Sequence, residues 1–117
     1  KREQKIKNQR LKEEGLIKQM LNRGQFAILK SDSFDHEKYE INKPVVSIGR
    51  AASNFVTLNN SNISQKHCDI VFEENNYKII DHKSTNGVLV NGLKVEEEIL
   101  KNGDVITLAD VEITFYL

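Results

Sequence analysis

The sequence has little of what ties a small extracellular domain together or carries a chain across a membrane. Its single cysteine, Cys68, excludes an internal disulfide and fits a reducing compartment. No apolar run approaches the roughly 18 residues that a membrane-spanning helix needs. No secretory signal opens the chain, and its first residue, Lys1, is not an initiator methionine. We therefore expect a soluble intracellular module that belongs to a longer protein and makes no membrane contact.

Net charge is also absent, because 17 Lys and Arg side chains balance 17 Asp and Glu side chains. The balance is uneven: residues 1–23 hold eight basic and three acidic side chains, a net charge of +5, which leaves −5 for the remainder. Nucleic-acid binding depends on Lys and Arg placed against phosphates. The acidic body therefore argues against direct nucleic-acid binding by the domain.

The first 24 residues have the composition of a helix. Lys, Glu, Gln and Leu, all good helix formers, are frequent there, and the apolar residues form a partial stripe that tightens after Gly15. A long coiled coil needs about three or four sustained heptads, which this stretch does not show. We expect residues 1–24 to form a helical linker or extension that ends at Gly24. A helix docked on the domain or on a partner is the alternative.

From Gln25 onward the period of the apolar pattern changes from that of a helix to that of a strand. About ten short runs, such as VVSIG, HCDIVFE and VEITFYL, alternate with turn-forming segments such as EENN, HKSTNG and KNGD. Pro44 stands at a strand entry, where its missing N–H does no harm. Strands of this number and spacing predict one all-β domain, a sandwich or a barrel.

The stretch SQKH places Ser64 near His67, two of the residue types of a hydrolytic triad. Ser64 has no neighbouring glycine to form a strained nucleophile turn, and side chains three residues apart in a strand face opposite sides. Cys68 faces away from His67 for the same reason. His36, His67, Cys68 and His82 show no paired metal-ligand spacing. We therefore expect no enzyme, no metal and no other cofactor, with a buried structural role for Cys68 and a solvated one for His36 and His82.

Polar motifs remain at the predicted strand ends and loops. They are Gly49-Arg50, Ser64 with His67, Thr85-Asn86-Gly87 and Val90-Asn91-Gly92. Together they offer one fixed cation, several hydroxyls and several amides, a set that suits an oxyanion better than a base or an apolar ligand. Loops on a rigid scaffold commonly carry recognition. A plainer interpretation is also open: a surface salt bridge for Arg50, a turn cap for Ser64 and a tight turn at residues 85–87.

The motifs GR, SxxH, STNG and VNG, in this order and spacing, resemble those of the forkhead-associated domain. The resemblance covers residues 25–117 and leaves residues 1–24 outside it. It implies an antiparallel β-sandwich of about eleven short strands that binds phosphothreonine-containing peptides through its loops.

The resemblance also assigns roles to individual residues. It implies that Arg50 binds the phosphate, that Ser64 forms a hydroxyl hydrogen bond with it and that Thr85 lines the phosphothreonine site. Asn86 resembles the residue that grips the peptide backbone, as an amide that donates and accepts can do. Gln65 follows the phosphate-binding serine and is a further candidate. Gly49 and His67 match family positions that support the loops without touching ligand, and a structural role is implied for Gly87 and Asn91 as well.

The chain departs from the family pattern around the phosphate. Asn62 stands where the family often has a basic residue, and Gln65 stands where it often has Asn, Lys or Arg. The turn AASNFV lacks the acidic residue that is usual there. Asn62 and Lys66 are secondary candidates for ligand contact, although we expect Lys66 to point away along its strand. Fewer cations around a dianion predict modest affinity.

These observations favour a monomeric phosphothreonine-peptide-binding module that recruits its parent protein to phosphorylated partners in a signalling context. A phosphate-independent contact through a sandwich face or the N-terminal helix is the alternative, and an enzyme is disfavoured. Likeness of FAILKS, YEINKPVVSIGR and VEITFYL to forkhead-associated domains of nuclear proteins favours a nuclear setting.

Overall fold

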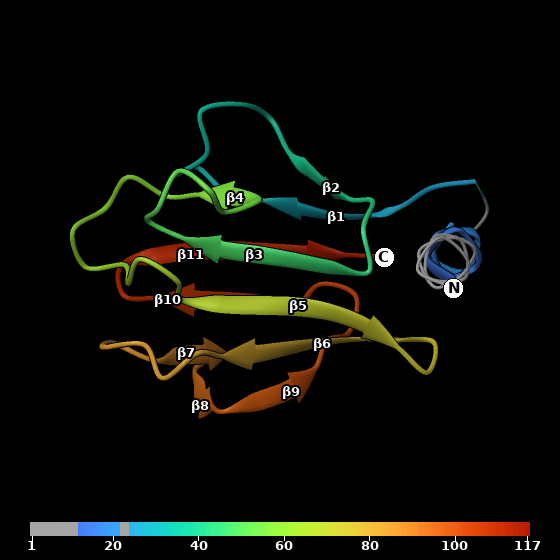
Figure 1. Cartoon of the computed structure of the whole chain (residues 1–117). Helices are drawn as coiled ribbons and strands as arrows, with labels where there is room; N and C mark the ends of the chain where they lie inside the picture. The colour runs from blue at the N-terminus through green and yellow to red at the C-terminus, as the bar shows by residue number, and fades with distance from the viewer. Residues whose placement is uncertain (1–11, 22–23) are drawn as a thin grey trace, which may run out of the picture.

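The computed structural model describes residues 12–21 and 24–117. Residues 12–20 are helical, in agreement with the composition of this stretch, whereas residues 1–11 and 22–23, where a helix was also expected, lie outside the described residues. Eleven short strands follow and confirm the all-β prediction (Figure 1). No helix within the described part of the chain is long and apolar enough to cross a membrane.

One layer of the sandwich is a six-stranded sheet in the order β2-β1-β11-β10-β7-β8. Its strands are β1 (Ala27–Lys30), β2 (Tyr39–Ile41), β7 (Val88–Val90), β8 (Leu93–Val95), β10 (Val105–Leu108) and β11 (Val111–Tyr116). The apolar pattern does not reveal β8, because this edge strand has no buried residue. Leu93, its first residue, is 72% exposed.

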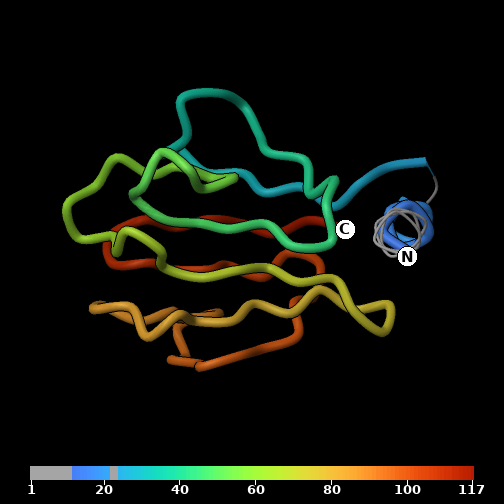
Figure 2. Tube along the Cα trace, viewed as in Figure 1, coloured from blue at the N-terminus to red at the C-terminus, as the bar shows by residue number. Residues whose placement is uncertain are grey.

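The other layer is a five-stranded sheet in the order β4-β3-β5-β6-β9. Its strands are β3 (Val45–Gly49), β4 (Val56–Thr57), β5 (Cys68–Glu73), β6 (Asn76–Asp81) and β9 (Glu97–Ile99). Figure 2 shows how the chain passes between the two layers. The pairs are antiparallel as expected, except that β3 and β4 run parallel, with Ile48 opposite Val56. Because the two strands run in the same direction, the loop of residues 50–55 must turn back along β3 before β4 begins at Val56.

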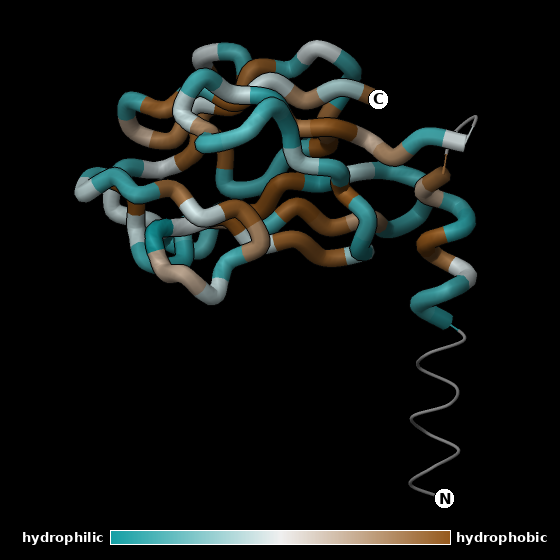
Figure 3. Tube along the Cα trace, turned by 90° about the horizontal axis from the view of Figure 1, so that it is seen from above, coloured by the Kyte–Doolittle hydropathy of each residue, from teal (hydrophilic) through white to brown (hydrophobic). Residues whose placement is uncertain are grey.

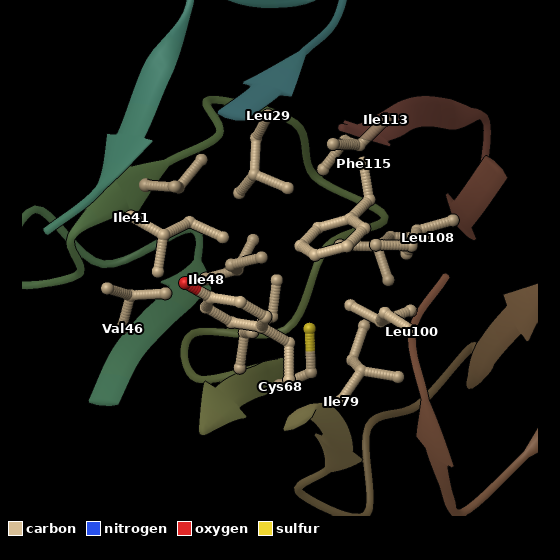
Figure 4. Close-up of a cluster of buried hydrophobic side chains, with 14 of the residues drawn as sticks. Leu29, Ile41, Val46, Ile48, Cys68, Ile79, Leu100, Leu108, Ile113 and Phe115 are labelled. Atoms are coloured by element: carbon tan, nitrogen blue, oxygen red, sulfur yellow. The ribbon is translucent and has the colours of Figure 1, made fainter. Parts of the chain in front are cut away.

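Alternation along the strands builds the core between the sheets. In β5, Cys68, Ile70 and Phe72 are buried, while the residues between them are half-buried. Side chains from both sheets, including Ile48 and Phe115, point toward one another in Figure 4. Each fully buried Leu, Ile or Phe stabilises the fold by about 1.5–3 kcal/mol. Figure 3 shows the apolar residues concentrated along the strands and the polar ones in the loops.

Two hairpin turns use residues in the left-handed region. Between β5 and β6, Glu74 and Asn75 have φ of 51° and 62°, and between β7 and β8, Asn91 and Gly92 have φ of 51° and 84°. Positive φ at both central residues is the type I′ geometry, which matches the twist of the flanking strands. Asn91 also binds the next loop, since its side chain donates to a carboxylate oxygen of Asp104 at 2.9 Å.

His67 holds together the loops at the opposite end of the sandwich and is completely buried. Its Nδ1 accepts a hydrogen bond from the backbone N–H of Ser64 at 3.1 Å, and its Nε2 lies 2.8 Å from the carbonyl oxygen of Gly87. A ring nitrogen that accepts an N–H carries no proton, so these partners select the neutral tautomer in which Nε2 donates. The backbone of His67 is paired as well, with Ile48 and His82.

Replacement of His67 by alanine should destabilise the domain. The substitution leaves the Ser64 N–H and the Gly87 carbonyl without partners in a buried place, which costs about 1–3 kcal/mol of unfolding free energy. Urea denaturation of His67→Ala and of His36→Ala, the same change at a histidine whose side chain is 49% exposed, measures the difference. Equal midpoints for the two variants would contradict the bracing role.

Candidate oxyanion-binding site

Three loops at the end of the sandwich braced by His67 bring the predicted residues together. They are residues 50–55, 58–67 and 82–87, which follow β3, β4 and β6. The backbone N–H of Arg50 donates to the Ser64 carbonyl at 3.0 Å, and the N–H of Thr85 donates to Ser64 Oγ at 3.1 Å. Ser64 is therefore the point where all three loops meet.

Arg50 is exposed and fixed by neutral partners. Its Nε donates to the carbonyl oxygen of Ile63 at 3.1 Å, and Ile63 itself is buried in the core. In the amide orientation that satisfies both side chains, the Gln65 oxygen accepts from Nη1 at 3.1 Å and from Nη2 at 3.2 Å. Within the described part of the chain no carboxylate pairs with Arg50, so the salt-bridge alternative does not hold.

Gly49 stands where two loops approach too closely for a side chain. A Cβ at this position would lie 2.4 Å from the backbone oxygen of Gln65 and 2.7 Å from Nδ2 of Asn54. Asn54 donates to the carbonyl oxygens of Ala51 and Gln65 at 2.9 and 2.8 Å, which ties the loop of Arg50 to the loop of Ser64. Sequence reasoning missed Asn54, although an Asn in a turn segment often bonds nearby backbone.

Ser64 and His67 do not form a nucleophile–base pair. Nδ1 of His67 binds the backbone N–H of Ser64, while Ser64 Oγ accepts from Thr85 on another loop. Strand alternation does not apply to Ser64 and His67, because β5 begins only at Cys68. The dyad is absent because the imidazole is committed to backbone groups. The hydroxyl hydrogen of Ser64 can still donate to a ligand.

The STNG turn presents Thr85 and Asn86 to solvent. Nδ2 of Asn86 donates to the carbonyl oxygen of Asn62 at 2.7 Å, so the amide is held across the gap between two loops. Gly87 is buried with a φ of 75°, and a glycine adopts this conformation without strain. The tight turn is thus present, and it positions side chains rather than merely reversing the chain.

Of the remaining predicted residues, Asn62 and Lys66 lie in the same loop as Ser64, whereas Asn91 does not belong to the loop cluster. Asn62 is exposed and contributes its carbonyl to Asn86. Lys66 is exposed in the same loop and makes no ion pair with a described residue. Asn91 lies at the far end of the sandwich, where it binds Asp104, and the structure does not bring it to the site.

The other histidines and the cysteine form no second centre. Within residues 12–21 and 24–117, no group of three or more His, Cys, Asp or Glu could hold a metal ion. Nε2 of His82 lies 2.7 Å from a carboxylate oxygen of Asp69, so His82 is paired rather than simply solvated. Burial raises the pKa of the Cys68 thiol, and the charges of Asp69 and Asp81 raise it further. Cys68 is therefore a poor nucleophile.

Comparison with known proteins identifies a matching family model and several similar proteins. A family model described as the FHA domain matches residues 46–109. The transcriptional regulatory protein EmbR of Mycobacterium tuberculosis is 35% identical over 80 residues, which cover 68% of this chain and 21% of EmbR. The glycogen accumulation regulator GarA of the same organism is 26% identical over 78 residues, 67% of this chain and 48% of GarA. The chain thus spans less than half the length of these relatives.

Solved structures agree in fold. Mycobacterium tuberculosis EmbR in complex with a low-affinity phosphopeptide superposes with a TM-score of 0.74 at 30% identity, covering 87% of this chain and 28% of EmbR. A chain from an analysis of phosphothreonine-dependent FHA domain interactions gives 0.73 at 30% identity, covering 78% of this chain and 95% of its own length. The sandwich, the loop cluster and these matches together place the chain in the forkhead-associated (FHA) domain family.

Proposed function

We propose that this domain binds a phosphothreonine-containing peptide and thereby recruits its parent protein to a phosphorylated partner, without catalysing a reaction. The observation that carries the proposal is the Arg50 guanidinium, which is held by Ile63 and Gln65, the two chain neighbours of Ser64, and has no carboxylate partner among the described residues. A phosphothreonine brings about −1.5 to −2 charges and three strong acceptor oxygens. An arginine fork meets such a group with paired, charge-assisted hydrogen bonds.

The side chains of Ser64, Thr85 and Asn86 complete the binding surface. Ser64 offers its hydroxyl hydrogen to a phosphate oxygen, and Thr85 lines the same side. Asn86 uses one N–H for Asn62 and keeps its amide oxygen and second N–H for the backbone of a peptide. Phosphate and peptide are thus read by different loops on one rigid end of the sandwich.

The relatives support phosphopeptide recognition and a signalling role, since EmbR was solved with a phosphopeptide. The curated relatives named above come from mycobacteria, so they give no support to a nuclear setting. We do not carry that setting into the proposal.

Substitutions in the site should rank in a fixed order. Arg50→Ala should lose about 2 kcal/mol of phosphopeptide affinity or more, because no other arginine follows residue 23. Arg50→Lys should recover only part of this, since an ammonium cannot form the paired contacts. Ser64→Ala should cost about 1 kcal/mol, because it removes one hydroxyl donor. Asn86→Ala should weaken phosphorylated and unphosphorylated peptides in proportion. Calorimetric titration with matched peptides measures all four.

The same titration tests the proposal as a whole. All variants should still fold, because none of the altered side chains belongs to the core. A wild-type domain that binds phosphorylated and unphosphorylated members of a diverse peptide library equally would instead support phosphate-independent contact. Arg50→Ala with wild-type phosphopeptide affinity would place the phosphate elsewhere.

Binding should weaken at low pH and, mildly, at high salt. Phosphothreonine loses its second charge below pH about 6, so the affinity should be full above that value and fall below it. Added salt should reduce affinity less than it does for nucleic-acid binding, because only one or two charges are matched. Titrations across pH 5–8 and over a salt series check both trends; a steep salt slope would indicate a polyanionic ligand.

A further inference from the structure

The Gln65 side chain binds the guanidinium of Arg50. Its amide oxygen accepts from both terminal guanidinium nitrogens, at 3.1 and 3.2 Å, while Nε is paired with the carbonyl oxygen of Ile63 at 3.1 Å. Each of the three guanidinium nitrogens therefore has a partner within the domain. Both partners are neutral oxygens, so the positive charge of Arg50 stays unmatched.

The two terminal nitrogens that converge on this amide oxygen are donors with which an arginine fork meets a carboxylate or a phosphate. We propose that Gln65 is an internal competitor for Arg50: its amide oxygen stands where a phosphate oxygen binds, and the phosphate must displace it. This inference rests on the proposed function, because it assigns Arg50 to the phosphate. It gives Gln65 a second role besides the predicted one of contacting the ligand.

Charge decides the outcome of this competition. The guanidinium is charged in both cases, but the amide oxygen offers it only a neutral dipole, whereas a phosphate dianion adds a charge–charge attraction and several acceptor oxygens, so the phosphate displaces the amide oxygen. The displaced contact still subtracts from the binding free energy. It lowers by the same factor the affinity of every ligand that uses the terminal nitrogens of Arg50, and it leaves the contact of Asn86 with peptide backbone unchanged.

The arginine itself does not depend on Gln65 for its position. The contact of Nε with Ile63 persists when the amide is removed, and Ile63 is anchored in the core with 1% of its surface exposed. Removal of the amide therefore frees the two terminal nitrogens without releasing the side chain. An acidic group in place of the amide would hold them more tightly, because both partners would then be charged.

Two substitutions of Gln65 that barely change the size of the side chain test whether its amide oxygen competes with phosphate for Arg50. Gln65→Met keeps the length of the side chain and removes the acceptor, and Gln65→Glu makes the acceptor anionic. Gln25→Met, at an exposed glutamine that precedes β1 at the other end of the sandwich, is the matched control. The probes are inorganic phosphate, a phosphothreonine peptide and its unphosphorylated form, each titrated into the complete chain.

Gln65→Met should bind inorganic phosphate and the phosphopeptide about threefold more tightly, the gain expected when a modest competing hydrogen bond is lost. Gln65→Glu should bind both more weakly, while the unphosphorylated peptide and the Gln25→Met variant should show no change. In the free protein, NMR signals of the Arg50 terminal nitrogens should report slower rotation in wild type than in Gln65→Met.

Weaker phosphate binding by Gln65→Met would make Gln65 a simple donor to the ligand and overturn the competitor role. Unchanged rotation of the Arg50 terminal nitrogens would also overturn it. The proposed function fails by a different result, in which the wild-type chain does not distinguish the phosphorylated peptide from the unphosphorylated one. The rotation measurement needs no ligand and still decides whether Gln65 holds Arg50 in that case.

Discussion

The geometry of the site depends on one buried imidazole. His67 lies between the two sheets at the end where the loops gather, and it binds the backbone of Ser64 on one side and of Gly87 on the other. Because the ring is buried, both of its nitrogens need hydrogen-bond partners. A buried polar group without partners would cost more free energy of folding than the hydrogen bonds contribute. The loop of Ser64 and the STNG turn are therefore fixed relative to each other before any ligand arrives.

Small or amide side chains then close the distance between loops. Gly49 allows the backbone of Gln65 to approach β3, and Asn54 and Asn86 bridge neighbouring loops through backbone carbonyls. These hydrogen bonds between uncharged groups hold the loops together without using the charge of Arg50. The guanidinium of Arg50 keeps its charge unmatched, which suits a site whose ligand is a dianion.

The sequence predicted the fold well, and the site in part. Period-two alternation in segments such as HCDIVFE identifies strands because a sandwich buries one face of each, but it could not reveal β8, in which no residue is fully buried. Spaced motifs indicated Arg50, Ser64 and Asn86 as neighbours, since family resemblance carries three-dimensional information. Contacts set by side-chain conformation, such as that of Gln65 with Arg50, leave no periodic signal in the sequence and required the structure.

The pairing of the first and last strands has a mechanical consequence. Strand β1 begins, and β11 ends, at the end of the sandwich away from the site, with Ile28 opposite Tyr116 in an antiparallel register (Figure 1). A tension applied through both ends of the domain would pull these strands apart from their adjacent ends, so their hydrogen bonds would break one after another instead of sharing the load. Under such tension the pairing of β1 with β11 would open first at the end of the sandwich where the force is applied. The recognition loops lie at the opposite end and would be the last part to bear load.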